Sequence, residues 1–537
     1  MPVLQFSITH FPFHNLSSLK SVSLVPWLSE KGLDERINDA FMPVAIWWEN
    51  TILSEIVLFG YGIPVVLIIL LSGALFFTLY FGFVNVRHFH TAIQVVRGKY
   101  DALEKGPKAS GNEADVSKDA EFSGEVNHFQ ALATAVSGTV GLGNIAMVAV
   151  AISIGGPGAT FWMILAGLLG MSTKFVECTL GVKYRDIDKS GNVYGGPMYY
   201  LSRGLKRKGF DKLGKFLAVT FSILCIGASF GGGNAFQSNQ AAAQIIERFG
   251  LTGPSTGSII GLVFAILTGI VIIGGIKRIA KVTEKVVPFM AILYVGGALF
   301  IIASQWQWVD DALALIVTEA FSPQATIAGG FVGVMIQGFR RAAFSNEAGA
   351  GSAAIAHAAV NTKHPVSEGL VALLEPFIDT VLVCSITAVV IVLFNMESVF
   401  VYGDVLNGEA LMQDGSRLGG VNLTSMAFEN SIRGSSYVLM VAVCLFAFST
   451  ILSWSYYGLQ AWKYLFGRGR IIDLTYKVLF LLFTVLGAAI TLDAVIKFSD
   501  AMILALVFPN MFGLLILFPD VKKEFVRYLG LIHTSKA

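Results

Sequence analysis

The chain has 537 residues, of which 54% are hydrophobic and only 14% are charged, and its mean hydropathy is +0.67. Soluble proteins carry charge on about a quarter of their residues, so this composition excludes an ordinary soluble protein and predicts one embedded in a lipid bilayer. The net charge of +2 gives no sign of nucleic-acid binding, and four single cysteines without a CxxC spacing argue against a metal centre or a disulfide scaffold.

The first 54 residues mix proline, serine, histidine and charged residues. Because they contain no long apolar run, we expect an N-terminal extension or a surface helix rather than a signal peptide. About 20 apolar residues cross the hydrocarbon core of a bilayer, and runs of that length follow from residue 55 onwards. Eleven crossings are predicted, at 55–84, 130–154, 158–182, 216–246, 257–275, 286–304, 326–356, 368–396, 437–463, 474–492 and 500–518.

Basic residues divide unequally between the two sets of alternate loops. The set that includes 85–127 and 183–215 holds 27 Lys and Arg, whereas the opposite set, which begins with residues 1–54, holds 7. Cytoplasmic loops carry the excess of these residues. We therefore expect a multi-pass plasma-membrane protein with its N-terminus outside and its C-terminus in the cytoplasm.

Two of the crossings are interrupted by glycine and polar residues, from Ser137 to Asn144 and from Gly338 to Gly349. Such breaks are tolerated only where they are buried in protein or line a cavity. They fall in the first and sixth of the last ten crossings, which is typical of an inverted repeat with a transporter's substrate site at the breaks. The predicted division is an outside extension (1–54), an extra transmembrane helix with a cytoplasmic loop (55–129), two five-helix repeats (130–305 and 306–518) and a cytoplasmic tail (519–537).

The first break offers two kinds of ligand group. Unwound carbonyls can replace the hydration shell of a cation, and the N–H groups that open the next half-helix favour a carboxylate. Close helix packing through small residues is the alternative. The run Gly141–Ala146 also fits the GxGxxA dinucleotide pattern, but no strand precedes it and no acidic residue follows at the required distance.

The second break carries charges inside a predicted crossing. Arg340, Arg341 and Glu347 must pair, reach the interface or face water, because a charge at the bilayer centre costs about 2.5–3.5 kcal/mol. A mutual Arg–Glu pair near a cavity is one expectation. It is compatible with a ligand site, because the segment 343–346 can still present backbone and amide groups.

Two further crossings are rich in polar groups. Asn234, Gln237 and Gln240 recur along one side of the third core crossing, either at a ligand site or in a polar seam between helices. In the eighth, the hydroxyls of Thr450 and Ser453 can join carbonyls around Na⁺ or bond back to their own helix. The neighbouring Trp454 is either a wall for a small side chain or a core aromatic.

Enzyme-like patterns lack their structural context. Gly227–Gly231 fits GxSxG, but it lies in an apolar helix rather than at a strand-to-helix turn. No His–acid pair lies nearby, and His88 and His90 are isolated. We therefore do not expect an enzyme.

Several long motifs, in order along residues 55–525, resemble those of the alanine or glycine:cation symporter family. They are Ser137–Asn144, Gly155–Ala159, Met171–Glu177, Gly195–Tyr200, Phe344–Gly349, His364–Val366 and Ser453–Gly458. The resemblance implies an all-α LeuT-type fold of eleven transmembrane helices, with a 5+5 inverted repeat preceded by one extra helix. It also implies a protein of the bacterial inner membrane that imports a small neutral amino acid (alanine or glycine, D-alanine included) with sodium and needs no other cofactor.

The resemblance also assigns roles to residues of this chain. The implied substrate-binding residues are Thr139, Gly143, Gln237, Ala343, Phe344, Ser345, Asn346 and Trp454. The implied sodium ligands are Ser137, Val140, Asn144, Thr450 and Ser453, the first two through their carbonyls.

Other functions remain open at this point. A proton-coupled symporter would use Glu177, Glu347, Glu375 or Asp379 as carrier, although Lys174, three residues before Glu177, indicates an ordinary ion pair. A related neutral substrate such as glutamine is a second alternative. A channel is a third, but it would favour a continuous polar stripe rather than polarity gathered at two breaks.

Overall fold

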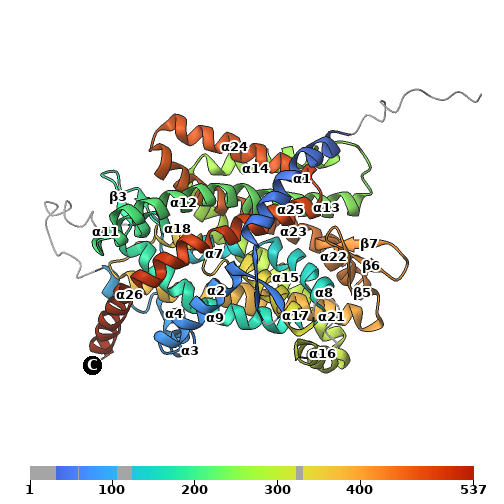
Figure 1. The fold of residues 1–537 in the computed structure, drawn as a ribbon, viewed down its shortest axis with the longest axis horizontal. Helices are drawn as coiled ribbons and strands as arrows, with labels where there is room; N and C mark the ends of the chain where they lie inside the picture. Colours follow the sequence, from blue (N-terminus) through green and yellow to red (C-terminus); the bar gives the residue numbers. More distant parts are fainter. Residues whose placement is uncertain (1–31, 59, 106–123, 322–329, 537) are drawn as a thin grey trace, which may run out of the picture.

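The computed structural model describes residues 32–58, 60–105, 124–321 and 330–536, which form a helical protein with three small antiparallel sheets (Figure 1). The prediction of a helical, polytopic membrane protein is confirmed, and the sheets were not expected. Within the described residues, seven helices are long and apolar enough to cross a membrane, and a bent pair adds an eighth.

The N-terminal part differs from the predicted first crossing. Helix α1 (Leu33–Ile52) precedes a hairpin of β1 (Glu55–Leu58) and β2 (Tyr61–Pro64), and only then does the apolar helix α2 (Val65–Tyr80) begin. Gly60 has a positive φ of 86° next to the turn, and Pro64 stands immediately before α2. The crossing predicted at 55–84 therefore contains a helix of 16 residues. Three short helices follow: α3 (Val84–Arg87), α4 (Phe89–Val96) and α5 (Asp101–Lys105).

The elements of the first predicted repeat follow the predicted crossings closely. They are α7 (His128–Thr139), η3 (Leu142–Asn144), α8 (Ala146–Gly155), α9 (Ala159–Lys183), β3 (Asp186–Ile187), β4 (Val193–Tyr194), α10 (Pro197–Tyr199), η4 (Tyr200–Gly204), α11 (Leu205–Arg207), α12 (Asp211–Phe230), η5 (Gly231–Ala235), α13 (Phe236–Phe249), α14 (Thr256–Ile272) and α15 (Gly275–Ser304). The axis turns by 55° between α7 and the η3–α8 segment.

The elements of the second predicted repeat contain more structure than expected. They are η6 (Trp306–Trp308), α16 (Val309–Phe321), α17 (Gly330–Asn346), α18 (Ala353–His357), α19 (Pro365–Ala372), α20 (Leu374–Pro376), η8 (Phe377–Cys384), α21 (Ser385–Phe394), η9 (Asn395–Glu397), β5 (Phe400–Leu406), β6 (Glu409–Met412), β7 (Arg417–Gly419), α22 (Gly420–Ser431), α23 (Ser435–Phe466), α24 (Arg470–Ala489), α25 (Leu492–Ala505) and α26 (Val507–Lys536). The segment 397–436, between the crossings predicted at 368–396 and 437–463, contains a three-stranded sheet and a helix. The predicted tail 519–537 continues α26 as far as Lys536.

The count of eleven crossings stays a prediction. Helices α2 and α14 are apolar but only 16 and 17 residues long, and the crossing predicted at 326–356 begins in 322–329, outside the described residues. Helices α14 and α24 pack side by side at the upper edge of Figure 1.

Burial separates lipid-facing helices from central ones. On α14 and α15, Ile259 and Ile292 are 62% and 73% exposed, as expected for side chains in contact with lipid. In contrast, nearly every residue of α8 is buried, including Ala146 and Val148 on opposite sides of the helix. The segments α7, η3, α8 and α18, together with the C-terminal half of α17, therefore occupy the interior.

Candidate functional site

The two glycine-rich breaks lie against each other in the centre of the protein. After α7 ends, Gly141 is extended (φ −129°, ψ −151°), and a Cβ there would lie 2.5 Å from Thr450 Oγ1. A Cβ on Gly143 would lie 3.3 Å from the Phe344 ring of α17. At the other break Glu347 has a φ of 54°, a left-handed conformation that L residues rarely adopt. The close approach of these segments explains why glycine occupies the break.

Gln237 of α13 ties the first break to the third core helix. The Leu142 N–H donates to Gln237 Oε1 at 3.0 Å, and Gln237 Nε2 donates to the Gly232 carbonyl at 2.9 Å. The Gly141 N–H donates to Asn144 Oδ1 at 3.0 Å. The N–H groups that open the η3–α8 half are thus held by side-chain amides, which a carboxylate can replace as acceptor.

Aromatic rings close the space around these glycines. Trp454 Nε1 donates to the Gly138 carbonyl at 3.2 Å, and a Cβ on Gly233 would overlap the Trp454 ring. The rings of Phe236 and Phe344 meet edge to face at 5.3 Å. Such walls suit a small ligand with an apolar side chain.

All eight expected substrate-binding residues are buried; Gln237, Phe344 and Trp454 lie against η5, and Gly143 lies against Phe344. Thr139 Oγ1 donates to the Ala135 carbonyl of its own helix at 3.3 Å, and the Ala343 carbonyl accepts from the Glu347 N–H at 3.2 Å. Ser345 and Asn346 turn toward η8, where Asn346 Nδ2 donates to Thr380 Oγ1 at 2.9 Å.

Three of the five expected sodium ligands form one group of oxygens. Thr450 Oγ1 donates to the Ser137 carbonyl at 2.9 Å, and Ser453 Oγ lies 3.0 Å from Ser137 Oγ and 2.8 Å from the Thr134 carbonyl. Ser137 Oγ donates to the Ser449 carbonyl at 2.7 Å. These hydroxyl and carbonyl oxygens from α7 and α23 are the kind of ligands that a hard cation such as Na⁺ binds.

For the other two expected ligands, Val140 and Asn144, the structure shows hydrogen bonds outside this group of oxygens. The Val140 N–H donates to the Val136 carbonyl at 2.7 Å where α7 ends. Asn144 Nδ2 donates to Asp379 Oδ2 at 2.8 Å.

Asp379 belongs to this neighbourhood although it was expected only as a proton carrier. It is fully buried in η8 and accepts from Ser345 Oγ at 2.6 Å and Thr380 Oγ1 at 2.7 Å as well as from Asn144. It thus contacts both broken helices. A carboxylate within an apolar crossing is a functional candidate by default. The position of Asp379 inside such a crossing was therefore the sequence feature that could have assigned it to the site.

The expected mutual pairing of Arg340 and Arg341 with Glu347 is wrong. Both arginines bind Asp500 of α25, and Arg340 also binds Glu49 of α1. The Glu347 carboxylate instead accepts from the Ser352 hydroxyl.

A second ion pair also differs from the expectation. Lys174 Nζ donates to Glu375 Oε1 at 3.0 Å rather than to Glu177. Glu177 accepts from the Gly349 N–H at 2.9 Å and from Asn510 Nδ2 at 2.7 Å.

The amides of the third core helix bond to several different elements. Asn234 Nδ2 donates to the Phe480 carbonyl at 2.6 Å, and Asn239 Nδ2 donates to the Gly487 carbonyl at 3.1 Å, both on α24. These two form a polar seam, whereas Gln237 faces the break. Gln240 Oε1 accepts from the Val421 N–H of α22 at 2.9 Å.

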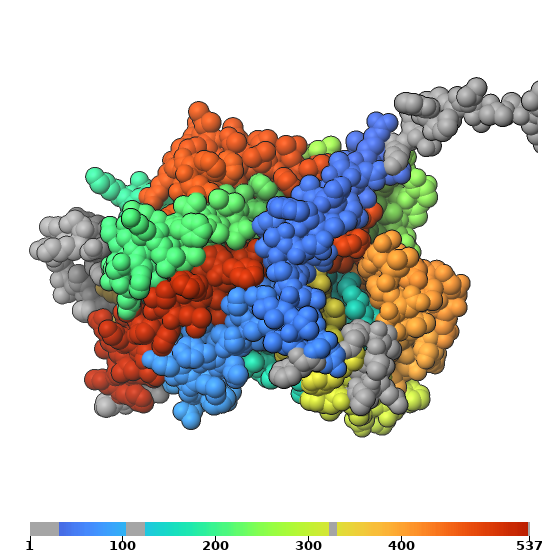
Figure 2. Space-filling view, in the orientation of Figure 1, coloured from blue at the N-terminus to red at the C-terminus, as the bar shows by residue number. Residues whose placement is uncertain are grey.

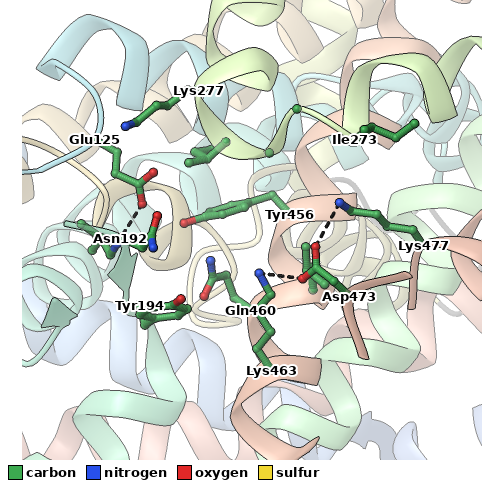
Figure 3. Close-up of a pocket in the computed structure, with 15 residues that line it drawn as sticks. Glu125, Asn192, Tyr194, Ile273, Lys277, Tyr456, Gln460, Lys463, Asp473 and Lys477 are labelled. Carbon is green, nitrogen blue, oxygen red and sulfur yellow. Dashed lines mark hydrogen bonds and ion pairs between the residues drawn. The ribbon is translucent and has the colours of Figure 1, made fainter. Parts of the chain in front are cut away.

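A polar cavity of about 320 Å³ is lined by Tyr456, Gln460 and Lys463, which follow Ser453 along α23 toward the end expected to face the cytoplasm (Figure 3). Figure 3 shows Tyr456 between Glu125 on one side and Asp473 with Lys477 on the other. Burial raises the pKa of the Glu125 carboxyl, although that carboxyl accepts a hydrogen bond from the Val193 N–H. The cavity is thus lined by residues of α23 and by charged groups of the loops expected in the cytoplasm.

Comparisons with known proteins agree with this geometry. The sodium:alanine symporter family matches residues 47–536. Sodium/alanine symporter AgcS of Methanococcus maripaludis is 37% identical over 462 residues, which cover 86% of this chain and 93% of that protein. A probable sodium/glutamine symporter, GlnT of Bacillus subtilis, is 32% identical and covers 84% of this chain and 85% of its own. The crystal structure of MhsT in complex with L-phenylalanine shares the fold, with a TM-score of 0.50 and 15% identity over 74% of this chain and 99% of that one.

Proposed function

The chain belongs to the sodium:alanine symporter family, and from this premise we propose that it imports alanine or glycine together with Na⁺ by alternating access. Membership of a family of transporters and the apolar helices make it an integral, multi-pass membrane protein. The amino acid, the coupling ion, the bacterial inner membrane and the outward-facing N-terminus are parts of the proposal. So is the division into repeats at 130–305 and 306–518.

The observation that carries the proposal is the contact between the two helix breaks. A zwitterion that leaves water needs partners for both of its charges. The N–H groups of Gly141 and Leu142 offer donors to the carboxylate once Asn144 and Gln237 release them. Carbonyls near Phe344 and the second break offer acceptors to the ammonium group.

The size of the substrate follows from the walls of the same site. Phe344 lies over Gly143, and Trp454 lies over Gly233, so that even an added Cβ meets a ring at either glycine. Alanine and glycine need the least room among amino acids. A glutamine side chain would require one of these rings to turn away.

Sodium is proposed to bind where α7 meets α23. Ser137, Thr450 and Ser453 present hydroxyl and carbonyl oxygens within hydrogen-bond distance of one another. Asp379 adds a negative charge near the position proposed for the substrate carboxylate. Two buried carboxylates near each other repel, so the proposal includes a cation or a proton that balances this charge when the amino acid is bound.

Proton coupling is the second candidate, and a specific chain of groups favours it. His128 Nδ1 contacts Glu368, which lies 2.6 Å from His357 Nδ1. His357 Nε2 is in turn 3.6 Å from Glu375 Oε2, and Glu375 binds Lys174. All five side chains are at least nine-tenths buried, so they form a titratable path from the start of α7 toward the second break.

Uptake into proteoliposomes under imposed ion gradients distinguishes the two. A sodium symporter accumulates labelled alanine when only a Na⁺ gradient is applied, and accumulation is abolished when Na⁺ is equal on both sides. Accumulation driven by a pH gradient without Na⁺ would replace the sodium proposal by the proton one. Trans-stimulation by internal alanine separates either carrier from a channel.

A further inference from the structure

Helix α1 has no part in the proposed site, yet it is firmly attached to the helices around it. It runs obliquely over α25 (Figure 1), and Figure 2 shows it on the surface of the molecule. Asp34 accepts from the Gly257 N–H at 3.1 Å and from Ser258 Oγ at 2.6 Å, where α14 starts. Asn38 Oδ1 accepts from the Thr491 N–H and hydroxyl at 3.0 and 2.8 Å, immediately before α25.

The other end of α1 enters a buried ion cluster. Arg340 Nη2 is 2.8 Å from Glu49 Oε1, and Arg340 Nε is 2.8 Å from Asp500 Oδ2. Arg341 Nη2 is 2.6 Å from the same Asp500 oxygen. Two arginines with Asp500 alone would leave one positive charge without a counter-charge, which is costly in a buried place. Glu49 makes the cluster neutral, so α1 supplies a charge that the interior requires.

The cluster joins both broken helices to α25. Arg341 Nη1 lies 3.0 Å from Met147 Sδ of α8, and Arg341 itself belongs to α17. Asp500 lies on α25, where the Phe498 ring would be 3.0 Å from a Cβ on Gly231 of η5. With the proposed orientation, α17 enters from outside, so the cluster lies on the outer side of the substrate site.

We propose that α1 is an external latch, in which Glu49 holds Arg340 inside the ion cluster and keeps α8, α17 and α25 closed over the substrate site. Opening toward the outside then requires Glu49 to leave Arg340. The latch rests on the proposed transport function, because opening and closing are steps of a transport cycle.

The exposure of the side chains indicates which contact breaks first. Glu49 and Arg340 are 19% and 17% exposed, whereas Asp500 and Arg341 are 0% and 2% exposed. Water competes with the more exposed pair, which makes that pair the weaker one.

The family match begins at residue 47, so the anchoring residues Asp34 and Asn38 precede it.

A buried cysteine beside the cluster reports whether the outer side opens. Ser499 is fully buried next to Asp500, and within the described residues its hydroxyl has no hydrogen-bond partner, so that Ser499→Cys is a mild change. Cys444, the native cysteine that is not fully buried, is replaced by alanine. The rate of modification by a membrane-impermeant thiol reagent added outside is then measured in vesicles.

Two variants of α1 are expected to speed the modification. Glu49→Gln should raise the rate about three- to tenfold, as expected for loss of a partly buried charge pair. Phe41→Ala should raise it as well, because the Phe41 and Phe498 rings pack at 4.9 Å and hold α1 on α25. Glu35→Gln changes an exposed glutamate of the same helix and should leave the rate unchanged.

The outcomes separate the latch from other effects. In an Arg340→Gln background, Glu49→Gln should add nothing, because its partner is gone; an undiminished increase there would overturn the latch. So would unchanged rates for both Glu49→Gln and Phe41→Ala. A protein that carries no amino acid but shows the expected rates would contradict only the proposed transport function.

Discussion

Replacing Thr450 by valine tests the proposed sodium site with little change of shape. The side chain keeps its branched form and loses its hydroxyl. In the unsubstituted protein this hydroxyl donates to the Ser137 carbonyl at 2.9 Å. Thr450 is 1% exposed, so water does not replace the lost group easily. The variant therefore separates the chemistry of the oxygen from the packing of α23 on α7.

The magnitude follows from the charge of the partner. A hydrogen bond between neutral groups contributes about 0.5–1.5 kcal/mol, whereas a contact with a charged group contributes about 1.5–3 kcal/mol. The free energy of unfolding should thus fall by about 1 kcal/mol. The Na⁺ concentration for half-maximal uptake should rise about 10- to 100-fold, since 1.4 kcal/mol is a factor of ten.

The assay is alanine uptake into proteoliposomes over a range of external Na⁺ at constant ionic strength. Ser455→Ala is the matched control, because Ser455 lies on the same helix but donates to the Leu452 carbonyl of that helix at 2.6 Å. It should leave the Na⁺ dependence unchanged. An unaltered Na⁺ dependence in Thr450→Val, with normal uptake, would refute the assignment of Thr450 as a sodium ligand.

Three further outcomes are expected. Gln237→Leu removes the partners of the Leu142 N–H and the Gly232 carbonyl. An unpaired buried group costs about 1–3 kcal/mol, so alanine affinity should fall about five- to a hundredfold while Na⁺ binding is retained. An affinity within twofold of the unsubstituted protein would assign Gln237 to structure alone. Gly143→Val should abolish alanine binding in folded protein, because a Cβ already approaches the Phe344 ring, and normal affinity would remove Gly143 from the site. A cysteine in the predicted outside loop 305–325 should react with an impermeant reagent from outside and one within 205–212 should not; the reverse pattern would overturn the orientation.

Glycine and polarity inside apolar runs were enough to predict where the helices break. The break at Gly141 and Gly143 follows from packing against Thr450 and Phe344, and the lack of a Cβ is visible in the sequence. The grouping of Ser137 with Ser453 came from family resemblance. Backbone ligands leave little trace in a sequence, and a hydroxyl on a helix bonds equally well to its own carbonyls.

Partners far apart in the chain could not be predicted in this way. Arg340 requires an acid, but the acids it contacts, Glu49 and Asp500, lie 291 and 160 residues away. Asn144 and Asp379 are likewise 235 residues apart. Charge balance demands a partner without identifying it.

The sheet within 397–436 has a local sequence signal, namely two dipeptides that favour tight turns. Asn407–Gly408 stands between β5 and β6, and Asp414–Gly415 stands between β6 and β7. Asn-Gly and Asp-Gly between apolar runs are strong hairpin signals, and Asn407 and Gly408 have the positive φ values of 55° and 81° that such turns require.

The most direct test of sodium-coupled transport is alanine accumulation by the purified protein in proteoliposomes with an inward Na⁺ gradient and no pH gradient. The account predicts accumulation above the external concentration, which disappears when Na⁺ is equal on both sides and falls with Thr450→Val at low Na⁺. Accumulation that follows a pH gradient in the complete absence of Na⁺ would contradict it.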